Sequence, residues 1–156
     1  MTKLRTRAAP TARTHTLIVA EPPPAYITHP PLVVDCSALS AFLFAEPMRE
    51  EALQQLTGRS LHAPTLLDHE IASVAFKKRR QNWPPAAIDM ALADYAELRI
   101  TLHRCDLAAQ VGLAERYALS AYDAAYLWLA AEMKAPLATF DKALGLAAQA
   151  HLSQLK

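Results

Sequence analysis

Four acidic residues stand where a fold could bring them together. Asp35 ends the apolar stretch LVVD and Asp141 follows PLATF, while Glu70 and Asp123 lie near the start of largely apolar helical segments. Carboxylate oxygens suit Mg²⁺ or Mn²⁺, which binds one or two of them and keeps several waters for substrate phosphates. The six histidines and two cysteines form no comparable set. This pattern favours phosphodiester hydrolysis by water that one or two metal ions activate.

Each of these acids also has a purely structural interpretation. Asp123 follows Ser120 by three residues, which is the spacing of a capping box at a helix start. Asp141 could cap the last helix, Asp35 could be a turn residue, and Glu70 could be an exposed helix position. The residues taken singly leave both interpretations open. Purely structural roles explain the set of four acids less well, because burying an unpaired carboxylate on an apolar helix surface costs free energy.

The elements that must position these acids alternate between short apolar strands and longer helices. Strands are predicted at 32–34, 61–64, 99–104 and 136–140, and helices directly after residue 35 and at 46–56, 65–80, 86–98, 106–118, 121–134 and 142–150. Thr65 and Asp68 have capping-box spacing at the start of the third of these helices. No clear apolar strand follows the last helix, so we expect a short final edge of the sheet.

This alternation predicts an α/β fold. Strands separated by helices of ten or more residues pair in parallel through right-handed crossovers, which gives a three-layer α/β/α sandwich with a central parallel sheet. Ligands bind at the carboxyl ends of the strands in such sheets. Asp35 and Asp141 both stand at strand ends, so we expect them to converge at that edge.

The composition indicates one folded domain with an appended arm. The chain has 156 residues, 53% of them hydrophobic, and a net charge of +1. Residues 1–31 hold four basic residues against one acidic residue and a cluster of prolines, so we interpret them as an extended or loosely held arm before a domain at 32–156. No apolar run is long enough to span a membrane, and two cysteines are too few for a disulfide framework. We expect a soluble, cytoplasmic protein.

A basic run, KKRR, occupies residues 77–80. It could contact nucleic-acid phosphates through Lys77, Lys78, Arg79 and Arg80. Basic residues are also favoured at helix C-termini, where they interact with the negative end of the helix dipole. The sequence leaves both roles open.

The segments around the four acids resemble those of a known family. VVDCSAL, APTLLDHEIASV, YALSAYDAAYLWLA and PLATFDKAL are similar, in this order and spacing, to the signature segments of PIN-domain ribonucleases, in particular the VapC-type toxins of bacterial toxin–antitoxin pairs. The resemblance covers residues 32 to about 148. Carried over by position, it implies metal-binding and catalytic roles for Asp35, Glu70, Asp123 and Asp141, and supporting roles for Ser37 and Thr139.

The family resemblance implies a function and partners as well. It implies a PIN-like fold, RNA cleavage, a homodimer, and a cognate antitoxin whose C-terminal segment wraps the toxin and blocks its site. The leading hypothesis is therefore a Mg²⁺- or Mn²⁺-dependent endoribonuclease toxin of a type II toxin–antitoxin system. The alternatives are a structure-specific or RNA-processing PIN nuclease outside such a system, and a non-catalytic PIN-like binding module. The intact acidic set argues against the module, because a protein without catalysis has no need of four converging charges.

Overall fold

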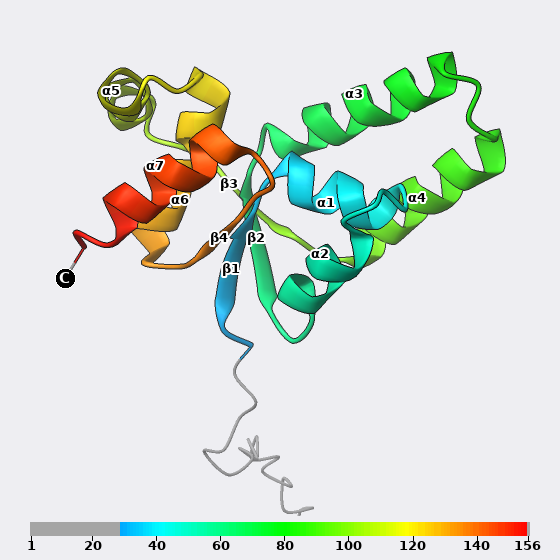
Figure 1. Ribbon diagram of the computed structural model, residues 1–156, viewed down its shortest axis with the longest axis horizontal. Coiled ribbons are helices and arrows are strands. Elements are labelled where there is room, and N and C mark those ends of the chain that lie inside the picture. Colours follow the sequence, from blue (N-terminus) through cyan, green and yellow to red (C-terminus); the bar gives the residue numbers. More distant parts are fainter. Residues whose placement is uncertain (1–28, 156) are drawn as a thin grey trace, which may run out of the picture.

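The computed structural model describes residues 29–155, and within them the chain forms a four-stranded parallel sheet (Figure 1). Its strands are β1 (Pro31–Val34), β2 (Ser60–Pro64), β3 (Thr101–His103) and β4 (Leu137–Ala138). They lie in the order β3-β2-β1-β4, and every pairing is parallel. The register places Leu32 opposite Leu61, Val33 opposite Leu137, and Ala63 opposite Leu102.

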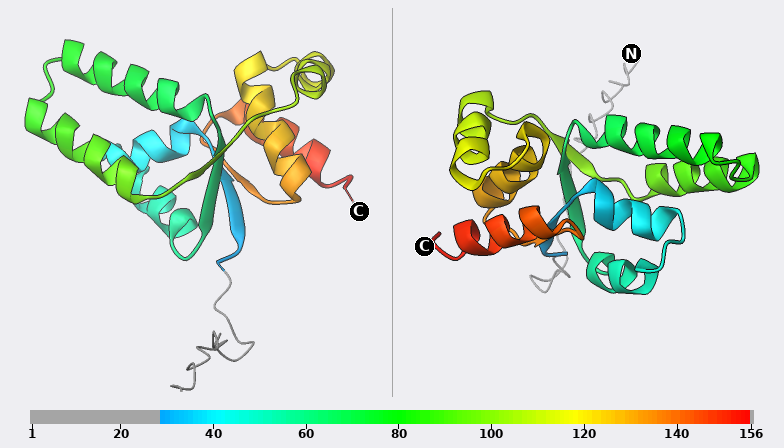
Figure 2. Two further views of the ribbon diagram at one scale, coloured as in Figure 1. Left: turned by 180° about the vertical axis from the view of Figure 1, so that it is seen from behind. Right: turned by 45° about the horizontal axis from the view of Figure 1, so that its top comes forward.

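Helices cover both faces of this sheet. They are α1 (Cys36–Leu43), α2 (Arg49–Leu56), α3 (Leu67–Arg80), α4 (Pro85–Glu97), α5 (Leu107–Tyr117), α6 (Ala121–Met133) and α7 (Lys142–Leu152). Figures 1 and 2 show α1 to α4 on one side of the sheet and α5 to α7 on the other, with α3 and α4 projecting as a hairpin. The predicted three-layer α/β/α sandwich is confirmed.

The core lies where the two helical layers meet the central strand. Val33 and Val34 of β1 are fully buried, as expected for a strand covered on both faces. Leu127 and Leu129 of α6 are also buried, and this helix packs on β1 and β2. The short β1 is therefore held firmly at the centre of the sheet, which fixes the position of the residue that follows it.

Two predicted helix starts differ from those in the structure. The second helix begins at Arg49 and not at residue 46, because Pro47 disfavours helical geometry in the residue before it. The capping box predicted for Thr65 and Asp68 is wrong. Helix α3 has Leu66 at its N-cap without a side-chain hydrogen bond, and Asp68 instead accepts a 2.7 Å hydrogen bond from the Tyr95 hydroxyl.

The last strand is shorter than the segment 136–140 that the sequence predicts. Only Leu137 and Ala138 are extended in β4, because Thr139 turns its hydroxyl to Asp35 and Asp141 already caps α7. No further strand pairs with the outer side of β4 among the described residues. The expected short final edge of the sheet is confirmed in this part of the chain.

The beginning of the chain is described only from His29 onward. The arm predicted for residues 1–31 therefore lies almost entirely outside the described residues. Its last residue, Pro31, already belongs to β1 and pairs with Ser60. Among residues 29–155, no helix is both long and apolar enough to cross a membrane.

Candidate active site

The four acids predicted to form a site stand at the amino ends of four different helices. Asp35 caps α1 and Asp141 caps α7, while Glu70 and Asp123 lie in the first turns of α3 and α6. These helices begin beyond the carboxyl ends of the strands or in the loops that follow them (Figure 1). Helix N-termini carry partial positive charge, so this arrangement stabilises carboxylates.

Asp35 is the most deeply fixed of the four. Its residue is only 5% exposed. One carboxylate oxygen, Oδ1, accepts hydrogen bonds from the Ala38 amide at 2.9 Å and from the Ser37 hydroxyl at 2.8 Å. The other, Oδ2, accepts from the Thr139 hydroxyl at 2.5 Å. A buried carboxylate needs such partners, and here they also fix its orientation.

Two hydroxyl groups tie Asp35 to the segment that carries Asp141. The Ser37 hydroxyl oxygen accepts a hydrogen bond from the Phe140 amide at 2.8 Å. The Thr139 hydroxyl oxygen accepts one from the Asp141 amide at 2.9 Å. Each hydroxyl thus donates to Asp35 and accepts from the loop after β4. Both predicted supporting residues therefore lie between the first and last acids.

Glu70 approaches from α3 and is held by a tyrosine of α6. The Tyr126 hydroxyl donates a hydrogen bond to Glu70 Oε2 at 2.5 Å, and Tyr126 is otherwise buried. The sequence analysis did not identify Tyr126. In the sequence, Tyr126 occupies one apolar position of a helix. Only the packing of α6 beside α3 shows that its hydroxyl reaches Glu70.

Asp141 is the N-cap of α7, whereas Asp123 lies in the first turn of α6 and pairs with Ser120, the N-cap of that helix. The Ser120 hydroxyl accepts from the Asp123 amide at 3.0 Å and lies 2.6 Å from the Asp123 carboxylate, to which it donates. The Asp141 carboxylate accepts from the Leu144 amide at 2.8 Å. Capping leaves a second carboxylate oxygen for other partners. A structural role and a role in the site are therefore compatible for both residues.

Burial raises the pKa of the Asp35 carboxyl above its usual value. Hydrogen bonds from Thr139, Ala38 and Ser37 oppose this rise, and the negative charge of Asp141 adds to it. The buried carboxylate is therefore costly to ionise without an additional positive charge nearby.

Burial likewise raises the pKa of the Glu70 carboxyl. The hydrogen bond from Tyr126 opposes this effect, while the charges of Asp35 and Asp123 add to it. The acids thus form a row in which Asp141 acts on Asp35, and Asp35 and Asp123 both act on Glu70. In each of these pairs the like charge disfavours ionisation of the affected carboxyl group.

The donor chemistry of this row fits a hard divalent cation. Among residues 29–155, no three His, Cys, Asp or Glu side chains are grouped closely enough to surround one ion. An all-protein cage of the zinc type is therefore not formed by them. A row of carboxylates fits an ion such as Mg²⁺, which binds one or two carboxylates and completes its shell with water.

The basic run lies at the far end of the helix that carries Glu70. Lys77, Lys78, Arg79 and Arg80 form the last turn of α3. Lys78 is occupied within the protein, because its amino group lies 2.9 Å from Glu46 Oε1 and 4.5 Å from the centre of the Trp83 ring. The other three are exposed. The run ends about 15 Å along the helix from Glu70, at 1.5 Å per residue.

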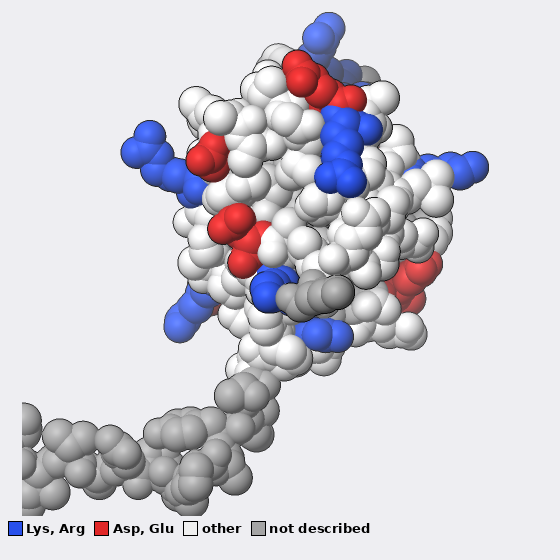
Figure 3. Space-filling model, turned by 90° about the vertical axis from the view of Figure 1, so that its left-hand side faces the viewer, with Lys and Arg blue, Asp and Glu red and all other residues white. Residues whose placement is uncertain are grey.

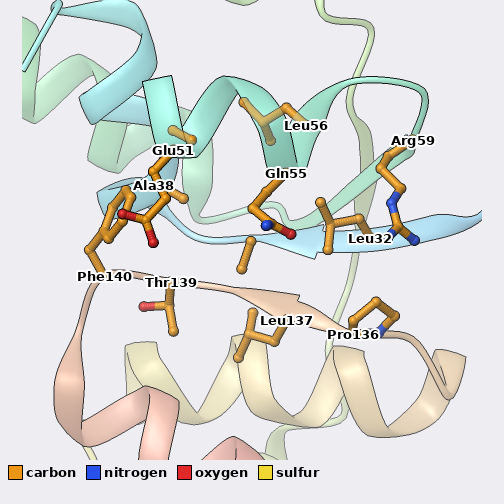
Figure 4. Close-up of a pocket in the computed structure, with 12 residues that line it drawn as sticks. Leu32, Ala38, Glu51, Gln55, Leu56, Arg59, Pro136, Leu137, Thr139 and Phe140 are labelled. Carbon is orange, nitrogen blue, oxygen red and sulfur yellow. The ribbon is translucent and has the colours of Figure 1, made fainter. Parts of the chain in front are cut away.

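A separate groove of about 240 Å³ lies between α2 and β4 (Figure 4). Its walls mix apolar side chains such as Leu32, Leu56 and Leu137 with polar ones such as Gln55. At one end Glu51 lies toward Phe140 and Thr139, and at the other Arg59 lies near Pro136 (Figure 4). Because Thr139 bonds Asp35, this groove adjoins the acidic site at one end.

The structure also pairs two histidines that are far apart in the sequence. His62 Nδ1 and His103 Nε2 are 3.0 Å apart, and Ser60 Oγ lies 3.1 Å from His62 Nε2. They come from the neighbouring strands β2 and β3, so their proximity depends on strand register and no helical spacing could reveal it. Their partners are one another and Ser60, and none of the four acids is among them.

The model of the PIN domain matches residues 32–150 of the chain. The chain belongs to the PIN-domain family. This PIN-domain chain is 36% identical over 126 residues to the VapC ribonuclease Mb0985 of Mycobacterium bovis and, equally, to the ribonuclease VapC9 of Mycobacterium tuberculosis. In both comparisons the matched region covers 76% of this chain and 92% of the relative. Its relationship to the VapC-type ribonucleases of the family is thus confirmed.

The fold of this PIN-domain chain also resembles a solved structure. The crystal structure of PAE2754 from Pyrobaculum aerophilum superposes with a TM-score of 0.62 at 20% sequence identity. The match covers 81% of this chain and 89% of that one. It supports the arrangement of sheet and helices described above.

Proposed function

We propose that this chain is a divalent-metal-dependent endoribonuclease of the VapC type and the toxin of a type II toxin–antitoxin system. The observation that carries this proposal is the row of four carboxylates at helix N-termini, with Asp35 oriented by two hydroxyl groups. Its relatives are named VapC ribonucleases, and nucleases of this family generally depend on a divalent metal. The cation proposed here is Mg²⁺ or Mn²⁺, as one or two ions.

In this proposal the site residues have distinct roles. Asp35, Glu70, Asp123 and Asp141 hold the cation and are the catalytic acids. When bound there, the cation would act as a Lewis acid and would lower the pKa of a water molecule. Ser37 and Thr139 hold Asp35 in one orientation by donating to its two oxygens. Tyr126 does the same for one oxygen of Glu70.

The function is tested most directly by RNA cleavage with and without divalent cations. We expect the purified full chain to cut single-stranded RNA in Mg²⁺ or Mn²⁺ and to lose this activity in EDTA, because carboxylates alone cannot neutralise the negative charge that develops on the scissile phosphate. Cleavage should return when the cation is added in excess. Cleavage that persists unchanged in EDTA would contradict the proposal.

The exposed part of the basic run is proposed to contact RNA phosphates. Replacing Lys77, Arg79 and Arg80 by Gln should weaken RNA binding and reduce the salt slope by about 0.7 for each lost contact with single strands. Lys78 is left in place because it pairs with Glu46. Binding measured across a salt series checks the result.

The matched control for this run is Arg99→Gln, which removes an exposed cation from the loop between α4 and β3. It should leave the salt slope unchanged. If the salt slope of RNA binding is also unchanged in the triple variant, the basic run does not contact RNA and only solvates the end of α3.

A second copy of the chain and an antitoxin are the proposed protein partners. The side of the molecule seen in Figure 3 carries scattered Lys, Arg, Asp and Glu side chains over a mostly uncharged surface. In α5 no residue is buried, and Leu107 and Val111 are 74% and 52% exposed. Such a surface supports homodimer formation. A chain that stays monomeric in analytical ultracentrifugation at high concentration would contradict it.

The antitoxin is proposed to use the groove of Figure 4 and the outer edge of β4. This edge is open among the described residues, and the groove beside it offers both apolar and polar side chains and includes Thr139. An extended peptide can add to such an edge, with side chains in the adjoining groove. The variant Leu137→Glu should no longer bind the antitoxin. Antitoxin binding that persists in this variant would contradict the proposed placement.

The domain boundaries are likewise proposed. We place the nuclease domain at 32–156 and treat residues 1–31 as an appended arm, because the four acids lie between positions 35 and 141 and the family model matches 32–150. We also propose that the protein acts in the cytoplasm, where its RNA substrates are. Loss of all cleavage in a folded chain without residues 1–28 would contradict the boundary.

A further inference from the structure

Beside Glu70 lies a groove in which an aromatic ring is exposed. The groove has a volume of about 460 Å³. It is lined by Leu66, His69, Glu70 and Ser73 from the start of α3 and by Tyr122 from the start of α6. Tyr122 is 67% exposed although it directly precedes Asp123. A large aromatic residue at the mouth of an acidic site is available to a ligand.

The position of this ring follows from the packing of α6 against α3. Tyr122 precedes Tyr126 by one helical turn, so both lie on the same side of α6. Tyr126 reaches Glu70 through its hydroxyl. Tyr122 therefore lies across the groove from the first turns of α3, and the groove extends from Glu70 to Ser73.

The polar groups of the groove are available as well. Among residues 29–155, the Tyr122 hydroxyl, the His69 ring and the Ser73 hydroxyl have no hydrogen-bond partner, and both His69 and Ser73 are exposed. Leu66 supplies an apolar wall. The groove thus combines an aromatic face with donors and acceptors, which is the chemistry that recognises a nucleobase.

We propose that this groove binds an unpaired nucleobase of the RNA substrate, stacked on Tyr122, beside the phosphate that is cut. The inference rests on the proposed ribonuclease function and adds to it a residue, Tyr122, that positions one base of the substrate. A base fits better than a phosphate, because the row of carboxylates next to the groove repels anions. A base in a duplex cannot present its face to Tyr122, whereas an unpaired base can.

Abasic substitution tests this directly. The cleavage position in a short single-stranded RNA is mapped first, and each nucleotide is then replaced in turn by an abasic one. For the wild type, kcat/KM should fall about 5- to 150-fold at one position beside the cut, the range expected for one stacked base. Tyr122→Ala should show the same loss on intact RNA and no further loss at that position, while Tyr122→Phe should stay close to wild type.

Phe76→Ala is the matched control. Phe76 is also an exposed aromatic residue of α3, at 63%, but it lies outside this groove. Its replacement should leave both the rate and the abasic profile unchanged. The inference is overturned if Tyr122→Ala cleaves like wild type, if it lowers the rate equally on intact and abasic RNA, or if its only effect is a changed oligomeric state in size-exclusion chromatography.

Failure of the ribonuclease proposal can be told apart from failure of this inference. Equilibrium binding of the same RNAs in EDTA requires no cleavage. Wild type should bind intact RNA more tightly than the RNA with the critical abasic position, and Tyr122→Ala should bind both equally. Absence of cleavage with this binding pattern would contradict only the catalytic proposal, and equal binding of both RNAs by wild type would contradict the stacking site.

Discussion

Asp141→Asn should abolish RNA cleavage and leave the fold intact. The Asn side-chain oxygen can still accept the hydrogen bond from the Leu144 amide, and Asn is as good a helix cap as Asp. It lacks the negative charge that the proposed cation requires, and metal catalysis is worth several kcal/mol of transition-state stabilisation. We therefore expect at least about a hundredfold loss of rate with a melting temperature close to wild type in EDTA.

Asp141→Ala separates the two roles of this residue. It should lose cleavage equally and, in addition, about 0.5 to 2 kcal/mol of stability, because the cap of α7 is lost. Thermal melts and RNA cleavage of both variants give the comparison. An Asp141→Asn protein that is destabilised and fully active would identify Asp141 as a cap only.

Asp106 provides a matched control within the same chain. It caps α5 as Asp141 caps α7, with its carboxylate accepting from the Ala109 amide at 2.9 Å. It is not one of the four acids of the site. Asp106→Asn and Asp106→Ala should reproduce the stability effects of the corresponding Asp141 variants while leaving cleavage unchanged.

The proximity of Asp35 to the segment that carries Asp141 could be predicted because it depends on topology. Once the strands are parallel, the residues after LVV and PLATF must lie at one edge of the sheet, and Ser37 and Thr139 connect Asp35 to the segment of Asp141 there. The choice between cap and site residue for each acid was left open by the sequence. The structure has Asp141 as a cap within a row of carboxylates, so the two interpretations do not exclude one another.

Features that depend on the packing between elements could not be predicted. The hydroxyl of Tyr126 reaches Glu70 only because α6 lies beside α3, and His62 meets His103 only in the observed strand register. The false capping box at Thr65 has a related cause. The Thr65 amide donates to the His103 carbonyl and so continues the pairing of β2 with β3. Residue spacing alone does not reveal that Thr65 takes part in strand pairing.

Removal of divalent cations should make stability depend on the ionisation of Glu70. Its pKa is raised in the folded protein, chiefly by burial. A carboxyl group with a raised folded pKa contributes stability that is fully present below its unfolded pKa and is lost as the pH rises through the folded value. In EDTA, the ionised carboxylate therefore destabilises the fold at neutral pH.

Glu70→Gln removes this ionisation while its side-chain oxygen can still accept from Tyr126. In EDTA, the stability of Glu70→Gln relative to wild type should rise as the pH increases above the unfolded pKa of a glutamate, about 4.3, and should level off once Glu70 is ionised in the folded protein. Urea unfolding at each pH measures the difference. Glu115→Gln, which changes an exposed carboxylate of α5, should show no such trend. A stability difference between Glu70→Gln and wild type that does not change with pH would mean that the folded protein does not disfavour ionisation of Glu70.

Addition of Mn²⁺ should reverse the order of these two proteins. For wild type, a cation that binds only the folded state adds about 2.7 kcal/mol at a hundredfold excess over its dissociation constant. Glu70→Gln has lost one ligand and should gain much less, so wild type becomes the more stable protein at neutral pH. Glu115→Gln should gain as much as wild type. An equal gain in stability for Glu70→Gln would show that Glu70 is not part of the proposed metal site. The repulsion expected in EDTA and the affinity for the cation have the same origin, which is a carboxylate held near like charges.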